Sequence, residues 1–274
     1  MDLSIEFFPP KTSHGKNKLR EVCSHLAREI NPNFFSVTFG AGGSTQEGTL
    51  STVQDIQEAG FKAVPHLSCI GSTRENIFKF LNQYKKMGIR RIVALRGDLP
   101  SIKQQSEFHH ADELVTFIRQ KTSDWFHIEV AAYPEAHPQS KSFPEDLENF
   151  TKKIKSGANS AITQYFYNPE AYFRFIEDIR KFGVEAPITP GIMPITNYNQ
   201  LIRLSETCGT EIPRWIRMRL ESYSNDPQSL KSFGLDVVAN LCEQLIDGGA
   251  PGLHFYSLNQ VEPTLELVKR INTN

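Results

Sequence analysis

Short runs of apolar and β-branched residues recur along the chain and alternate with longer segments whose apolar residues lie three or four positions apart. The short runs predict β-strands at residues 3–8, 34–39, 62–69, 91–96, 127–133, 160–166, 188–192 and 252–257. The longer segments predict helices at about residues 17–29, 46–59, 74–87, 110–120, 145–156, 169–182, 198–206, 228–247 and 262–271. Strand and helix therefore alternate from one end of the chain to the other.

Eight strands that alternate with eight or nine helices are typical of an α/β protein with a (β/α)8 TIM-barrel fold. The 274 residues divide into eight units of about 34 residues, close to the ~30 residues that a βαβ unit needs. An open, doubly wound parallel sheet is the competing layout. Because no linker rich in Gly, Ser or Pro divides the chain, we expect residues 1–274 to form a single domain, with an inserted turn or short helix at 207–227.

The first predicted strand carries a carboxylate among apolar residues. Leu3, Ile5 and Phe7 alternate with Glu6, so Glu6 points into the mouth of the barrel if the apolar set packs outward against helices. Burial beside Phe8 penalises the ionised form and favours the neutral acid that general acid catalysis requires. A strand-end glutamate in a salt bridge is the structural alternative.

Two further strand ends carry polar groups that suit a ligand site. The fourth strand ends in Arg96 and Asp98, which share one face and could also form an ion pair without a function. The second strand ends in Thr38 and a glycine-rich segment, which lets the backbone approach a ligand closely. The dinucleotide pattern GxGxxG is not fulfilled there, because position 45 is Thr.

Polar residues also follow the other predicted strands. These residues are His66, Tyr133, His137, Gln164, Tyr256 and Asn259. A single His or Gln at a strand end is usually a structural residue. Because parallel strands of a barrel end on the same face, the recurrence predicts one polar site at that face.

Composition narrows the class of protein. With 39% hydrophobic and 22% charged residues the chain is neither disordered nor fibrous, and a net charge of −1 with dispersed basic residues argues against nucleic-acid binding. Four scattered cysteines suit a reducing cytosol, and we expect a cytoplasmic protein without a signal peptide or membrane span. Zinc-site and serine-nucleophile motifs are absent from the sequence.

Eight segments, in this order and at these strand ends, resemble the methylenetetrahydrofolate reductase family. They are SIEFFPPKT, FFSVTFGAGG, PHLSCI, RRIVALRGDLP, VAAYPEAHP, GANSAITQYFYN, PGIMPI and HFYSLN, and the similarity extends from about residue 3 to 271. The resemblance implies a barrel that binds FAD and reduces 5,10-methylenetetrahydrofolate to 5-methyltetrahydrofolate with NADH or NADPH in a ping-pong mechanism, which feeds methionine synthesis. It also implies the bacterial form without a regulatory domain, and a homo-oligomer.

The same resemblance implies roles for individual residues. Glu6 resembles the family's general acid, and Asp98 resembles the aspartate between flavin and pterin, whose charge can stabilise a cationic iminium. The residues that resemble the cofactor site are Thr38 (on the nicotinamide side), Phe39, Ala41, His66, Arg96, Gly97, Asp98, Ala111, Tyr133, His137, Asp146, Asn149, Lys152 and Lys153. The residues that resemble the substrate site are Gln164, Gln200, Leu204, Tyr256 and Gln260.

Two positions depart from the family pattern. Leu204 stands where the family often has an aromatic residue, and Gln260 stands where the family often has arginine. Two other functions therefore stay open: a flavin-independent barrel enzyme that uses Glu6 and Asp98 as an acid/base pair, and a non-catalytic barrel that binds folate or a partner protein. Bound flavin, and its reduction by a pyridine nucleotide, would distinguish the reductase from both.

Overall fold

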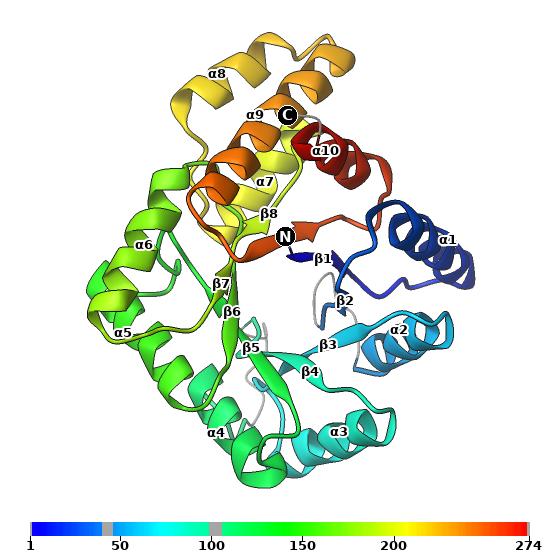
Figure 1. Ribbon diagram of the computed structural model, residues 1–274, viewed down its shortest axis with the longest axis vertical. Coiled ribbons are helices and arrows are strands. Elements are labelled where there is room, and N and C mark those ends of the chain that lie inside the picture. Colours follow the sequence, from blue (N-terminus) through cyan, green and yellow to red (C-terminus); the bar gives the residue numbers. More distant parts are fainter. Residues whose placement is uncertain (1, 40–45, 99–105, 273–274) are drawn as a thin grey trace.

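The computed structural model describes residues 2–39, 46–98 and 106–272, and within them nine strands form one parallel sheet that is encircled by helices (Figure 1). The strands are β1 (Asp2–Phe7), β2 (Phe34–Val37), β3 (Ala63–Ser68), β4 (Arg91–Leu95), β5 (His127–Ala132), β6 (Ser160–Thr163), β7 (Ile188–Thr189), β8 (Gly191–Ile192) and β9 (Gly252–Tyr256). Their order in the sheet is β7-β6-β5-β4-β3-β2-β1-β9-β8.

The sheet closes into a barrel through β7 and β8, which are two halves of one predicted strand. Pro190 separates them, because proline has no N–H to donate to a neighbouring strand. β7 pairs with β6 and β8 pairs with β9, while β1 pairs with both β2 and β9. Eight barrel positions therefore form a closed ring, which confirms the predicted (β/α)8 fold and excludes the open sheet.

Ten helices lie within the described part of the chain. They are α1 (Ser13–Ile30), α2 (Gln46–Glu58), α3 (Arg74–Lys86), α4 (Ala111–Thr122), α5 (Phe143–Lys155), α6 (Pro169–Lys181), α7 (Tyr198–Cys208), α8 (Arg214–Ser222), α9 (Pro227–Asp247) and α10 (Glu262–Asn272). The predicted irregular stretch 207–227 contains α8, which packs on α9 outside the ring of helices (Figure 1). None of the helices in the described ranges is long and apolar enough to cross a membrane.

Local signals explain where several helices begin. Thr73 and Asn168 accept hydrogen bonds from the first turns of α3 and α6, as their sequence predicts. Helix α1 begins four residues earlier than predicted, because the Thr12 side chain accepts a hydrogen bond from the Gly15 N–H and caps it. Strand β6 ends at Thr163, three residues earlier than predicted, and Tyr165 packs into the core beyond it.

Apolar residues form two separate clusters on the two sides of the barrel wall. The larger cluster lies between strands and helices and contains Ile5 and Phe7, both completely buried. The smaller cluster lies within the barrel and consists of Phe34, Val64, Val93 and Ile162, with Leu95 packed against it. Outward packing of the apolar positions of β1 is thereby confirmed, and Glu6 faces inward.

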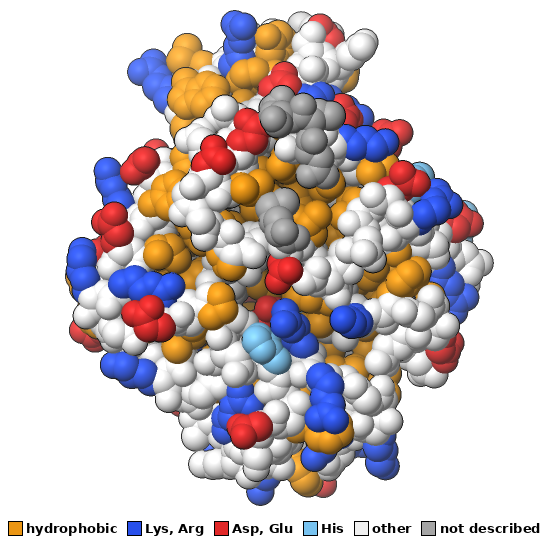
Figure 2. Space-filling view, viewed as in Figure 1, with side chains coloured by type: hydrophobic (Ala, Val, Ile, Leu, Met, Phe, Trp, Pro, Cys, Tyr) orange, Lys and Arg blue, Asp and Glu red, His pale blue; other side chains and the backbone are white. Residues whose placement is uncertain are grey.

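The outer surface carries interspersed charges. On the face shown in Figure 2, Lys and Arg side chains alternate with Asp and Glu side chains. Hydrophobic side chains are exposed on α8, where Trp215 and Met218 are 61% and 56% exposed. Trp215 still contacts Phe233 of α9 edge-to-face, so α8 is attached to the body of the protein by aromatic packing.

Candidate active site

The centre of the candidate site is a carboxylate between two imidazoles. One carboxylate oxygen of Glu6, Oε2, lies 3.4 Å from Nε2 of His66 and 3.7 Å from Nε2 of His254. The His254 ring is completely buried, and its Nδ1 is 2.7 Å from the Ser4 hydroxyl. The Glu6 side chain keeps 18% of its surface exposed, so it lies at the junction of the barrel interior and the solvent.

The two imidazoles supply proton-carrying groups beside Glu6. Burial lowers the pKa of His66, although the nearby Glu6 carboxylate opposes this shift. The Nε2 atoms of both rings are buried and have no hydrogen-bond partner among the described residues. His254 is not among the residues predicted from the sequence, although it lies two residues before Tyr256 and therefore on the same face of the strand.

The end of β4 brings Arg96, Gly97 and Asp98 to the same mouth. Nε of Arg96 donates to the Gly97 carbonyl at 3.1 Å, and Asp98 is exposed. In the part of the chain that the structure describes, Arg96 and Asp98 form no ion pair. Gly97 has a left-handed backbone (φ 87°), and a Cβ on it would lie 3.0 Å from Ser68 and Ile70 side-chain atoms. The close approach of the β3 and β4 ends therefore requires glycine at this position.

The end of β5 and helix α5 form a polar wall of the site. The rings of Tyr133 and His137 lie edge-to-face with centroids 4.5 Å apart, and Asp146 Oδ2 accepts from the His137 N–H at 3.2 Å. Lys153 Nζ donates to the Ala131 carbonyl at 2.5 Å. Burial lowers the pKa of Lys153 to about 8, while Asp146 opposes the shift. An anionic ligand beside Lys153 would favour its charged form.

The remaining predicted cofactor residues occupy different environments. Asn149 is exposed but shares the helix face of Asp146 and Lys153, whereas Lys152 is exposed one position away from that face. Thr38 is buried, and its hydroxyl has no hydrogen-bond partner in the described ranges. Phe39 and Ala111 are half-buried, while Ala41 lies outside the described residues.

Two of the predicted substrate residues line one pocket. Gln200 and Leu204, both on α7, border a hollow of about 240 Å³ that is open to solvent. Tyr165 and Leu258, which were not predicted from the sequence, line the same hollow because the loops after β6 and β9 meet there. Gln260 is exposed and does not line it.

Gln164 and Tyr256 lie next to this hollow. The Gln164 side-chain oxygen accepts from the Tyr165 N–H at 3.0 Å. The Tyr256 hydroxyl donates to the Thr163 carbonyl at 2.7 Å, and its ring contacts Tyr165 edge-to-face. Both residues thus contact Tyr165, which lines the hollow, and their roles stay predictions.

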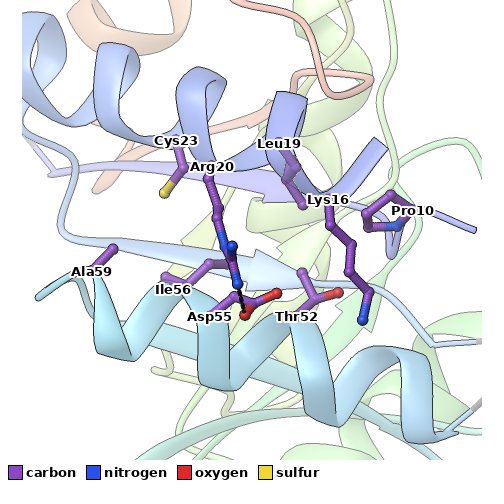
Figure 3. Close-up of a pocket in the computed structure, with 9 residues that line it drawn as sticks. All are labelled: Pro10, Lys16, Leu19, Arg20, Cys23, Thr52, Asp55, Ile56 and Ala59. Atoms are coloured by element: carbon purple, nitrogen blue, oxygen red, sulfur yellow. Dashed lines mark hydrogen bonds and ion pairs between the residues drawn. The ribbon is translucent and has the colours of Figure 1, made fainter. Parts of the chain in front are cut away.

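A second hollow, of about 300 Å³, lies in the outer ring between α1 and α2 (Figure 3). The Arg20 and Asp55 side chains form an ion pair across it at 2.6 Å. None of the predicted site residues lines it. It lies where α1 packs against α2, whereas the hollow beside Gln200 lies at the ends of the strands.

Glu135 is a titratable group beside the site that sequence analysis did not select. It follows β5, and its Oε2 accepts from the Glu211 N–H at 2.9 Å, which connects this loop to the segment after α7. Burial raises the pKa of Glu135 to about 7, the hydrogen bond opposes the shift, and the Glu211 charge adds to it. The two residues are 76 positions apart, so no local sequence pattern predicts this contact.

Glu135→Gln is expected to stabilise the protein at pH 8 and to have no effect near pH 4.5. The folded protein holds a proton on Glu135 between about pH 4.5 and 7 that the unfolded chain has released, so stability falls as the pH rises through this range. Gln keeps an acceptor for the Glu211 N–H and cannot ionise. Thermal unfolding at the two pH values measures the effect, about 3 kcal/mol at most. An equal change at both pH values would contradict the assigned ionisation.

Known proteins resemble this chain over nearly its whole length. The family model "Methylenetetrahydrofolate reductase" matches residues 1–272. The 5,10-methylenetetrahydrofolate reductase of Pectobacterium carotovorum is 38% identical over 96% of this chain and 87% of its own, and that of Escherichia coli is 36% identical over 96% and 88%. The methylenetetrahydrofolate reductase (NADH) 1 of Arabidopsis thaliana is 36% identical over 93% of this chain and 46% of its own.

One solved structure has the same fold. It is an uncharacterized protein from Clostridium thermocellum that binds two copies of 5-methyl-5,6,7,8-tetrahydrofolic acid, with a TM-score of 0.66 and 16% identity. The similarity covers 99% of this chain and 94% of that one. At this identity the likeness concerns the fold, whereas the family model and the relatives at 36–38% identity cover nearly the whole sequence. The chain belongs to the methylenetetrahydrofolate reductase family.

Proposed function

We propose that this protein reduces 5,10-methylenetetrahydrofolate to 5-methyltetrahydrofolate with NADH or NADPH as the electron donor and FAD as the cofactor. The observation that carries the proposal is the position of Glu6, which faces two imidazoles at the mouth of the barrel. Membership of the reductase family supports the same reaction. One hydride from the nucleotide and one proton account for the reduction of each folate molecule.

The residues at the strand ends fit a flavin dinucleotide. The buried hydroxyls of Thr38 and Ser68 have no hydrogen-bond partner in the described part of the chain, so a ligand can use them. Gly97 lets the β3 and β4 ends pack closely, which keeps Ser68 beside Arg96, and Arg96 and Lys153 supply cations for a diphosphate. When bound, FAD supplies a centre that accepts hydride from the nucleotide and returns it to the folate.

In the folate reaction the protein's own residues would donate a proton and stabilise a positive charge. Glu6 would donate a proton to the nitrogen that leaves when the five-membered ring of the folate opens, and this leaves a cationic iminium carbon as the hydride acceptor. The Asp98 carboxylate stabilises that cation. Nε2 of His66 and Nε2 of His254 lie within 4 Å of Glu6, and imidazole rings at this distance can relay a proton to the carboxylate after it has donated its own.

The arrangement favours alternating use of one site. The described strands form one barrel, and the predicted nucleotide-side residue Thr38 and the predicted folate-side residue Gln164 directly follow the carboxyl ends of β2 and β6. The nucleotide and the folate would therefore bind in turn, as a ping-pong mechanism requires. We further propose that the enzyme is a cytoplasmic homo-oligomer whose product supplies the methyl group for methionine synthesis.

Anaerobic stopped-flow spectroscopy tests this function. The purified protein is loaded with FAD and mixed with NADH or NADPH, and bleaching of the flavin is recorded, followed by its reoxidation on addition of 5,10-methylenetetrahydrofolate. We expect both half-reactions. A protein that binds no FAD would favour the flavin-independent barrel enzyme, and a flavoprotein that neither nucleotide reduces would favour the non-catalytic barrel.

Leu204→Phe is expected to lower the KM for the folate or the nucleotide roughly two- to tenfold, with kcat changed less than twofold. Leu204 lines the hollow with Gln200 and Tyr165. An aromatic ring there can stack on a planar ligand, which contributes about 0.5–1.5 kcal/mol beyond burial. Steady-state kinetics with each substrate varied measures the effect.

Arg203→Phe is the matched control for this substitution. Arg203 is exposed, precedes Leu204 on α7 and does not line the hollow. The control adds an aromatic ring one residue away, and its KM values should equal those of the wild type. A lower KM in both variants would show that the effect does not come from stacking in the hollow.

A further inference from the structure

The turn after β9 contains two consecutive residues with strained backbone. Leu258 and Asn259 have φ values of 52° and 57°, a left-handed conformation that non-glycine residues adopt at a cost. Leu258 lines the hollow beside α7. Backbone strain persists where the surrounding contacts enforce it, and such sites are concentrated at functional positions.

Asn259 enforces this turn through a two-way contact with the strand that carries Glu6. Its Oδ1 accepts from the Phe8 N–H at 3.0 Å, and its Nδ2 donates to the Phe8 carbonyl at 2.8 Å. A carboxamide can accept and donate in this way, whereas a carboxylate can only accept. The main-chain pairing of β1 with β9 ends at Glu6 and Tyr256, so the Asn259 side chain extends it by two residues.

Further hydrogen bonds hold the backbone of residues 6–8 from the β9 side and from the β2 side. The Ser257 hydroxyl donates to the Glu6 carbonyl at 2.7 Å, and the Thr38 N–H donates to the Phe7 carbonyl at 2.9 Å. After Phe7, whose side chain is completely buried, the Asn259 amide holds the backbone of Phe8, whose own side chain is 40% exposed.

The Glu6 side chain, in contrast, has no hydrogen bond among the described residues. Its distances of 3.4 and 3.7 Å to the imidazole nitrogens allow electrostatic contact without fixing the carboxylate. The position of the carboxylate therefore depends on the backbone at residues 6–8. A displacement of about 1 Å can cost a catalytic group on the order of 100-fold in rate.

We propose that Asn259 is a positioning residue for the general acid: its carboxamide fixes the β1 end so that the Glu6 carboxylate meets the leaving nitrogen of the folate. This inference rests on the proposed function. The nucleotide half-reaction needs no proton from Glu6, so Asn259 acts on the folate half-reaction alone. Phe8 and Asn259 belong neither to the predicted cofactor residues nor to the β4 and β5 ends, so we expect the FAD content to stay unchanged when the contact is lost.

Asn259→Gly tests the proposal. Glycine adopts the left-handed backbone freely, so the turn is kept while both hydrogen bonds to Phe8 are lost. We expect the limiting rate of flavin reoxidation by 5,10-methylenetetrahydrofolate to fall roughly 10- to 100-fold, and flavin reduction by NAD(P)H to stay within twofold of wild type. Asn259→Asp, which keeps the accepted hydrogen bond and loses the donated one, should show the same split.

Asn31→Gly is the matched control. Asn31 is also a left-handed Asn (φ 51°), but it caps the far end of α1 and is exposed. The Asn31→Gly substitution should leave both half-reactions and the FAD content unchanged. If Asn259→Gly leaves the folate half-reaction intact, or slows both half-reactions equally together with a lower Tm, Asn259 is structural only and the proposal is wrong. If the wild type performs neither half-reaction, the proposed function itself fails.

Discussion

Glu6→Gln is expected to abolish folate reduction while flavin reduction by NAD(P)H, followed with an artificial electron acceptor, continues at the wild-type rate. The amide keeps the size and polarity of the side chain but has no acidic proton. Loss of a general acid lowers a rate by about 10²- to 10⁴-fold. Because His66 and His254 both face Glu6, neither imidazole replaces it at the mouth of the barrel without moving.

The two half-reactions of the Glu6 variant are measured separately by anaerobic stopped flow. Glu135→Gln is a suitable control, since it removes a half-buried carboxylate from the loop after β5 without touching Glu6. The control should retain both half-reactions. An equal loss of both in Glu6→Gln would mean that Glu6 maintains the site as a whole and does not act as the acid.

Gly191→Ala is expected to destabilise the protein strongly. A Cβ at this position would collide with the Thr163 carbonyl and would lie 2.6 Å from the Tyr256 ring. Overpacking against flexible side chains costs about 1–3 kcal/mol, and a backbone carbonyl in a barrel strand cannot move aside, so we expect at least about 3 kcal/mol. Thermal unfolding should show this as a Tm lower by roughly 6–12 °C.

Gly183→Ala separates this collision from ordinary backbone strain. Gly183 has φ 75°, and no atom lies within 4 Å of the position that an alanine Cβ would occupy, so alanine there costs only the left-handed conformation, about 1–2 kcal/mol. The Tm of Gly191→Ala should be the lower of the two. Equal Tm values for the two variants would contradict the prediction. They would show that β8 shifts to make room for the added methyl group.

The alternation of residues in the sequence was sufficient to predict the barrel and the direction of Glu6. Ile5 and Phe7 are apolar and Glu6 is not, and a strand has a period of two, so one local pattern decides which side chain faces inward. The same reasoning anticipated that His66, Tyr133, Gln164 and Tyr256 share one face of the molecule.

The same alternation could not predict which residues from distant segments contact one another. The Ser4 hydroxyl and His254 are 250 positions apart, and Glu135 and Glu211 are 76 positions apart. The contact between Asn259 and Phe8 joins the two ends of the chain. No local pattern encodes such pairs, because they depend on which strands become neighbours when the barrel closes.

The sequence by itself therefore determined the alternation of strands and helices, the face on which polar residues follow the strands and the inward direction of Glu6, since each follows from residue periodicity and from the parallel direction of the strands. Only the tertiary structure decided what surrounds Glu6. Closure of the barrel brings β9 beside β1, and with it come the buried His254 ring and the Asn259 carboxamide. Burial and hydrogen-bond geometry are properties of that assembled arrangement, and they lower the pKa of His66 and hold the backbone on either side of Glu6.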